Sequence, residues 1–134
     1  MKKRCLSLED IETDVLILQK QIENVDANIE LINHYYVKDS LFYLQNPENR
    51  LPDFMLLDIK LPDGDAFEVL DFLKSKNLGN IPVFIITSSI FTECKEKALT
   101  YTNVVDYYQK PFNRSVLENI KQHLLQHNFI SADT

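Results

Sequence analysis

The sequence predicts a doubly wound α/β fold, in which helices cover both faces of a parallel sheet. Strand-like apolar runs and helix-like amphipathic segments alternate five times, with no long structureless insertion between them. Two of these runs, FMLL at 54–57 and IPVFIIT at 81–87, are almost wholly apolar, which is typical of strands covered on both faces. The 134 residues fit one such domain, so we expect a single domain over residues 1–134.

The first two strand–helix units are expected at residues 4–44. A short strand at 4–8 (RCLSL) precedes a helix whose apolar residues recur on one face: Ile11, Val15, Leu18 and Ile22. Acidic residues near the start of this helix suit its positive N-terminal end: Asp10, Glu12 and Asp14. Residues 28–32 alternate as in a second strand, and 40–44 favour a helix that ends before the Asn-Pro-Glu-Asn break.

The last three units follow the same pattern. The strand at 54–57 leads to a helix at 65–76, and the strand at 81–87 leads to a helix near 92–100. Pro82 stands near the start of its strand, where a missing N–H matters least. A fifth strand at 104–108 precedes a helix that Asn113 can cap, with one apolar face formed by Val116, Leu117, Ile120 and Leu124.

Composition and charge exclude several classes of protein. Fourteen basic and twenty acidic residues give a formal charge of −6, opposite to that of most nucleic-acid binders, so no direct contact with nucleic acid is expected. Apolar runs are far shorter than the roughly 20 residues that span a bilayer, and acidic residues interrupt the N-terminus before a signal-peptide core could form. We therefore expect a cytoplasmic chain without membrane insertion. The two glycines are too few for a glycine-rich nucleotide-binding motif.

Reactive side chains lie at or just after the ends of four of the five predicted strands, at the edge where ligand sites of such sheets lie. They are Glu9 and Asp10, Asp58, Thr87, and Lys110. Carboxylates about 4 Å apart repel by roughly 4 kcal/mol per pair at an effective dielectric constant of about 20. Three carboxylates at one edge therefore require a cation. Mg²⁺ is the natural choice, because this hard ion prefers oxygen ligands.

Taken together, these residues resemble the receiver domain of bacterial two-component response regulators, over nearly the whole chain. The matching features are an acidic pair after the first strand, Asp58 with Pro62 four residues later, Thr87 ending the fourth strand, Lys110–Pro111 after the fifth, and the aromatic Tyr107 three residues before the lysine. The resemblance implies a flavodoxin-like (βα)5 fold with strand order 2-1-3-4-5. Ala66 departs from the pattern, because the family commonly has glycine there.

The resemblance implies that Asp58 accepts a phosphoryl group from a phosphohistidine of a sensor histidine kinase or histidine phosphotransfer protein. Lys110 would neutralise the phosphoryl oxygens and Thr87 would hydrogen-bond them. Asp10, Asp58 and the backbone carbonyl of Lys60 would bind Mg²⁺ directly, with Glu9 acting largely through water. Such a domain is not a conventional enzyme, since it catalyses only its own aspartyl phosphorylation and dephosphorylation.

The resemblance also implies a switch formed by Thr87 and Tyr107. Phosphorylation would recruit Thr87 and let Tyr107 turn inward, which changes the surface of the fourth helix, fifth strand and fifth helix. That surface would signal to a downstream protein target. A cis Lys110–Pro111 bond is expected by resemblance. Only one helix and a short tail follow it in this sequence, so we expect a stand-alone receiver.

Other interpretations compete with this one. Alone, Thr87 would be an ordinary strand residue and Lys110 a surface charge. A receiver-like interaction module that is not phosphorylated is the main alternative, although the complete set of site residues argues against it. A haloacid-dehalogenase-type phosphatase would need a second aspartate where Lys60 stands. We further expect Tyr107 and Tyr108 to face opposite sides of their strand, one in the core and one exposed. The histidines match no metal-ligand spacing and are expected at the surface or its boundary: His34, His123 and His127.

Overall fold

The structure is a computed structural model, and it describes residues 2–127. The strands of the main sheet are β1 (Lys3–Leu8), β2 (Ile29–His34), β3 (Phe54–Leu57), β6 (Val83–Thr87) and β7 (Val104–Gln109). A small hairpin is formed by β4 (Lys60–Leu61) and β5 (Gly64–Asp65). The helices are α1 (Glu12–Val25), α2 (Val37–Gln45), α3 (Ala66–Ser75), α4 (Thr92–Ala98) and α5 (Arg114–Gln126).

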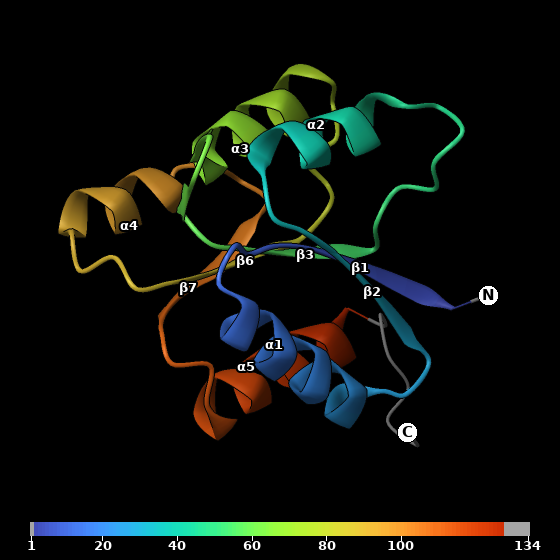
Figure 1. The fold of residues 1–134 in the computed structure, drawn as a ribbon, viewed down its shortest axis with the longest axis vertical. Helices are drawn as coiled ribbons and strands as arrows, with labels where there is room; N and C mark the ends of the chain where they lie inside the picture. Colours follow the sequence, from blue (N-terminus) through green and yellow to red (C-terminus); the bar gives the residue numbers. More distant parts are fainter. Residues whose placement is uncertain (1, 128–134) are drawn as a thin grey trace.

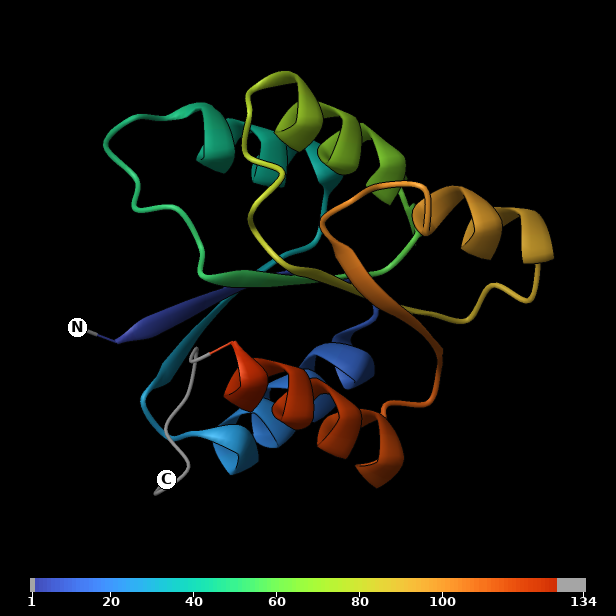
Figure 2. The same ribbon diagram turned by 180° about the vertical axis from the view of Figure 1, so that it is seen from behind.

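The main sheet is parallel, with the order β2-β1-β3-β6-β7. This confirms the predicted order, since β6 and β7 are the fourth and fifth strands of the prediction. Helices α1 and α5 cover one face, and α2, α3 and α4 cover the other (Figures 1 and 2). Leu8 pairs with His34 on one side and with Leu57 on the other. The residues that follow these strands therefore emerge at one edge of the sheet.

Alternating side chains of the strands build a core on each face of the sheet. Toward α2 and α3 lie Leu6, Leu8, Met55, Leu57, Val83 and Ile85. Toward α1 and α5 lie Cys5, Phe54, Leu56, Phe84 and Ile86. Full burial of one large apolar side chain contributes about 1.5–3 kcal/mol, so both layers stabilise the strands whose ends carry the site.

The two helices on the α1–α5 face bury the apolar side chains that their spacing predicts, with one exception. In α5, all four predicted residues are buried, and the Asn113 side chain accepts a hydrogen bond from the Val116 N–H at 3.1 Å. In α1, the buried residues are Val15, Leu18, Ile22 and Val25. The prediction for Ile11 is wrong, because this residue precedes the helix in extended conformation and is 46% exposed.

The predicted helix at 40–44 is too short, because α2 begins at Val37. Both carboxylate oxygens of Asp63 cap its first turn, accepting hydrogen bonds from the N–H groups of Val37 at 2.8 Å and Lys38 at 3.0 Å. This cap comes from a residue that is distant in the sequence, so local patterns do not reveal it. The second strand is also displaced, from the predicted 28–32 to Ile29–His34.

The segment after β3 forms a hairpin that the sequence did not predict. In it, Lys60 pairs with Asp65 and Leu61 with Gly64. Asp65 then caps α3: its side chain accepts from the Phe67 N–H, and Glu68 accepts from the Asp65 N–H at 3.1 Å. A Cβ atom at Gly64 would collide with the Glu68 carboxylate, which would have to shift from its place in the capping box. Ala66 is fully buried at the first position of α3.

Two further boundaries differ from the prediction. Strand β6 begins at Val83, because Pro82 has no N–H for the ladder and contributes only its carbonyl, which accepts from the Met55 N–H at 2.9 Å. Helix α4 ends at Ala98 rather than near residue 100.

Candidate functional site

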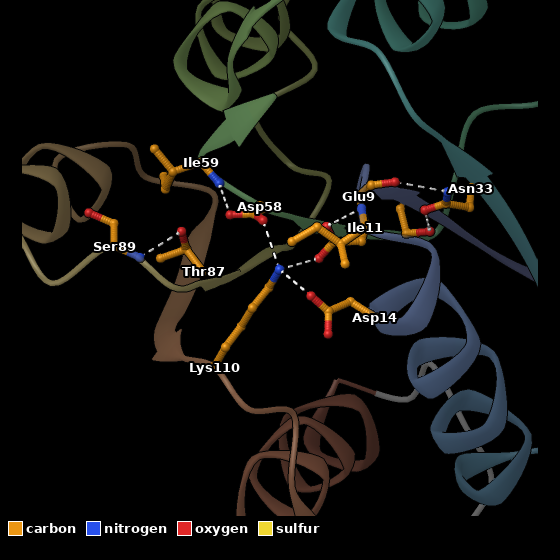
Figure 3. Close-up of polar contacts among 10 residues, drawn as sticks. Glu9, Ile11, Asp14, Asn33, Asp58, Ile59, Thr87, Ser89 and Lys110 are labelled. Carbon is orange, nitrogen blue, oxygen red and sulfur yellow. Dashed lines mark hydrogen bonds and ion pairs between the residues drawn. The ribbon is translucent and has the colours of Figure 1, made fainter. Parts of the chain in front are cut away.

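Asp58 lies directly after β3, at the edge of the sheet formed by the carboxyl ends of its strands, which we call the site edge. Its N–H donates to the Leu8 carbonyl at 2.9 Å, which ties it to the end of β1. Its side chain is only 6% exposed. One carboxylate oxygen accepts from the Ile59 N–H at 2.7 Å, and the other accepts from the Lys110 ammonium at 2.9 Å (Figure 3). The carboxylate is thus buried and oriented by two donors, and it shares the Lys110 cation with Glu9 and Asp14.

Glu9 lies beside Asp58, at the end of β1. Its N–H donates to the His34 carbonyl at 3.0 Å, and its side chain is 4% exposed. One carboxylate oxygen lies 2.6 Å from Lys110 Nζ, and the other accepts from the Ile11 N–H at 3.1 Å. Burial raises the pKa of Glu9, although Lys110 and the Ile11 N–H oppose this shift.

The structure brings together the three predicted acidic residues. Glu9, Asp10 and Asp58 each offer a carboxylate oxygen, and these oxygens lie within 4.8 Å of one another. Glu9 and Asp58 already share a cation, the Lys110 ammonium, and all the donors are hard oxygen atoms. The set therefore fits a small divalent ion such as Mg²⁺ or Mn²⁺. Lys60 lies in β4, with its side chain exposed.

Lys110 reaches this group from the loop after β7. Its N–H donates to the Thr87 carbonyl at 2.7 Å, and its peptide bond to Pro111 is cis, as predicted. The ammonium contacts three carboxylates: Glu9 at 2.6 Å, Asp14 at 2.8 Å and Asp58 at 2.9 Å. Burial lowers the Lys110 pKa, but the hydrogen bonds to Asp14, Glu9 and Asp58 outweigh it and raise the pKa overall. The lysine is therefore a fixed positive charge at neutral pH.

Thr87 and Tyr107 lie on neighbouring strands near this edge. Thr87 is buried, and its hydroxyl oxygen accepts from the Ser89 N–H at 3.2 Å. The Tyr107 hydroxyl is also buried and has no hydrogen-bond partner among the described residues. Tyr108 packs in the opposite core layer, as predicted. The expectation that one tyrosine of the pair is exposed is wrong, because Tyr107 packs against the core beside α3 and α4.

Asp14 is the site residue that the sequence did not reveal. Its position in the first turn of α1 was interpreted only as favourable for the helix dipole, yet its carboxylate contacts Lys110 from 96 positions away in the sequence. Ile59 and Ser89 were likewise not assigned their contacts with Asp58 and Thr87. A further acidic residue about one helical turn after the acidic pair is the signal that could have indicated Asp14.

The histidines lie at the boundary or on the surface, as expected. His34 is half-buried at the end of β2, and its Nδ1 lies 3.0 Å from the Ser40 hydroxyl. Among residues 2–127, the structure contains no helix that is long and apolar enough to cross a membrane.

Comparisons with known proteins agree with this geometry. The family model described as "Response regulator receiver domain" matches residues 6–122. The chain is 31% identical to the probable methanogenesis regulatory protein FilR2 of Methanothrix harundinacea, over 92% of this chain and 84% of that protein. It spans only 20% and 21% of two response regulators of Arabidopsis thaliana that it also matches.

Two solved structures are similar over most of their length. The Mn²⁺-bound form of the response regulator Rcp1 has a TM-score of 0.78 and 25% identity, covering 96% of this chain and 97% of that one. The phosphorylated cyanobacterial phytochrome response regulator RcpA has a TM-score of 0.72 and 27% identity, covering 92% and 91% of the two chains.

Proposed function

The chain belongs to the response regulator receiver domain family, and we propose from this premise that Asp58 accepts a phosphoryl group from a phosphohistidine. The donor would be a sensor histidine kinase or a histidine phosphotransfer protein. The observation that carries the proposal is the buried Asp58 carboxylate, 2.9 Å from the Lys110 ammonium at the carboxyl edge of the sheet. The phosphorylated RcpA structure supports it by similarity.

In the proposed step, a carboxylate oxygen of Asp58 attacks phosphorus and forms an O–P bond. The P–N bond to the histidine breaks, and its electron pair returns to the imidazole ring, which takes up a proton from solvent. Asp58 then carries an acyl phosphate. Lys110 offsets the charge of the phosphoryl oxygens, while the Thr87 hydroxyl and the N–H groups of Ile59 and Ser88 donate hydrogen bonds to them.

Asp10, Asp58 and the backbone carbonyl of Lys60 would hold Mg²⁺, with Glu9 acting largely through water. The bound ion supplies positive charge that offsets the carboxylates and the phosphoryl oxygens. The close approach of the three acidic side chains supports this assignment, as does the Mn²⁺-bound neighbour Rcp1.

The proposed output is a change in the surface formed by α4, β7 and α5, which a downstream protein target would recognise. A phosphoryl group adds about two negative charges, and Thr87 would leave the Ser89 N–H to contact it. Tyr107 would turn inward, into the space that Thr87 vacates. Its buried hydroxyl lies near Ser89, the residue whose N–H Thr87 now contacts.

Mass spectrometry tests the proposal directly. The protein is incubated with Mg²⁺ and acetyl phosphate, and we expect a mass increase of one phosphoryl group that disappears when Mg²⁺ is chelated. Asp58→Asn should abolish the adduct, while Asp53→Asn, an aspartate at the opposite end of β3, should retain it. Absence of the adduct, or its survival in Asp58→Asn, would favour the alternative of an interaction module that is not phosphorylated.

A further inference from the structure

Asp14 contributes a carboxylate to the site from α1, away from the strand ends that supply the other acidic residues. Figure 3 shows its side chain projecting from the helix toward the Lys110 ammonium, with Thr87 beyond Asp58 on the other side in this view. Its Oδ2 lies 2.8 Å from Lys110 Nζ, and its side chain is 29% exposed. Among the described residues, Lys110 is the only hydrogen-bond partner of this carboxylate.

The ammonium of Lys110 has no N–H group left for a further acceptor. A lysine ammonium has three N–H groups, and here three carboxylates surround it: Glu9, Asp14 and Asp58. A phosphoryl oxygen on Asp58 can therefore gain Lys110 only by displacing one of these acceptors. Asp14 is the acceptor that leaves most easily, because its side chain is 29% exposed, whereas those of Glu9 and Asp58 are 4% and 6% exposed. Water can solvate the Asp14 carboxylate once it is released.

We propose that Asp14 is a positioning residue that holds Lys110 in the resting site and competes with the phosphoryl group for its ammonium. This inference rests on the proposed function. Asp14 also adds a negative charge close to where the phosphoryl oxygens would lie, so both effects oppose retention of the phosphoryl group. The residue would thus set how readily the receiver is phosphorylated, without touching the transferred group.

The variant Asp14→Asn tests the competition, because it keeps the size of the side chain and removes its charge. We expect beryllofluoride, a phosphoryl mimic, to bind this variant about fivefold more tightly in the presence of Mg²⁺, as for the loss of one partly exposed ion pair. Glu12→Gln is the matched control. It removes an exposed charge from the same turn of α1, and Glu12 contacts the Tyr35 hydroxyl. Its affinity should equal that of the wild type.

Nuclear magnetic resonance of the Lys110 side chain supplies a readout that does not depend on phosphorylation. In the unliganded wild type, we expect the ammonium protons to be protected from exchange with water. Asp14→Asn should increase their exchange rate severalfold, and Glu12→Gln should leave it unchanged. A purely structural role for Asp14 would not alter the exchange of this one ammonium while the backbone amide spectrum stays the same.

The outcomes separate this inference from the proposed function. If the wild type binds no beryllofluoride and forms no adduct, the proposed function fails, and the competition fails with it. If the wild type binds but Asp14→Asn has equal or weaker affinity, only the role of Asp14 is overturned. Equal tightening in Glu12→Gln would reduce the effect to general charge and would also overturn it.

Discussion

Helices α1 and α4 both begin at the site edge of the sheet, yet they differ greatly in how many apolar side chains they bury against it. Helix α1 buries four apolar side chains and places Asp14 against Lys110. Helix α4 buries only Ala98. Three large apolar residues that flank α4 are exposed: Ile90 at 77%, Phe91 at 62% and Leu99 at 48%.

This difference assigns the two tasks of the proposed switch, phosphoryl chemistry and conformational change, to different parts of the molecule. The residues that would perform the chemistry follow strands that are packed on both faces, and the firmly packed α1–α5 layer covers one of these faces. Helix α4, next to Thr87 and Tyr107, has few buried apolar contacts that a movement would break. Segments of this kind open at low free energy, and they are the ones that can change position in response to a ligand.

The same substitution in the two regions should give the largest contrast. Ile22→Ala in α1 removes a side chain that is 1% exposed, and we expect the free energy of unfolding to fall by about 2–4 kcal/mol. Ile90→Ala, before α4, should change it by less than about 0.5 kcal/mol. Urea unfolding followed by circular dichroism measures both. Similar losses in the two variants would refute the comparison.

A substitution at the N-terminus of α2 should cause an intermediate loss of stability, because it would remove a helix cap and not a deeply buried apolar side chain. Asp63→Ala removes both hydrogen bonds to the first turn, with an expected loss of about 1 kcal/mol. Asp39→Ala removes an acidic residue from that same turn without removing the cap, and it should cost clearly less. Equal losses in urea unfolding would mean that charge alone, and not the cap, stabilises the helix.

The smallest expected effect is the pH-dependent change in stability that arises from His34, at the end of β2. Burial lowers the pKa of His34 below its ordinary value of 6.5, although Asp39 opposes the shift. The unfolded chain therefore binds a proton more readily, and stability from His34 is lost as the pH falls below 6.5. His34 is only half-buried, so we expect less than about 1 kcal/mol after solvent screening.

Urea unfolding at pH 7.5 and pH 5.5 measures this loss, with His34→Gln as the comparison. The wild type should lose more stability than the variant over this interval. An equal or smaller loss in the wild type would show that His34 is not disfavoured as a cation in the folded chain.

The fold could be predicted from the sequence because its main signals are local. Apolar runs such as 54–57, the spacing of Val116, Ile120 and Leu124, and the Asn113 cap all act within a few residues. The convergence of Glu9, Asp10 and Asp58 could also be predicted, because the carboxyl ends of parallel strands meet at one edge. Each of these inferences needs only the period of an element and the direction of the chain.

Two features that the sequence did not reveal depend on contacts between distant segments. The Asp14–Lys110 ion pair joins α1 to the loop after β7, and the Asp63 cap lengthens α2 from outside it. Ile11 has the spacing of a buried helical residue, but the chain has not yet entered the helix at that point. The first two outcomes depend on where one element lies relative to another, and the third depends on the residue at which a helix begins; periodicity encodes neither.

The cap from Asp63 has a mechanical consequence. The hairpin that follows Asp58 is hydrogen-bonded to two helices: Asp63 at its tip caps the first turn of α2, and Asp65 at its end caps the first turn of α3. A displacement that begins at Asp58 would therefore break the hydrogen bonds of Asp63 or move α2 as well, so the hairpin couples Asp58, the proposed phosphoryl acceptor, to the helices on the face of the sheet opposite α1.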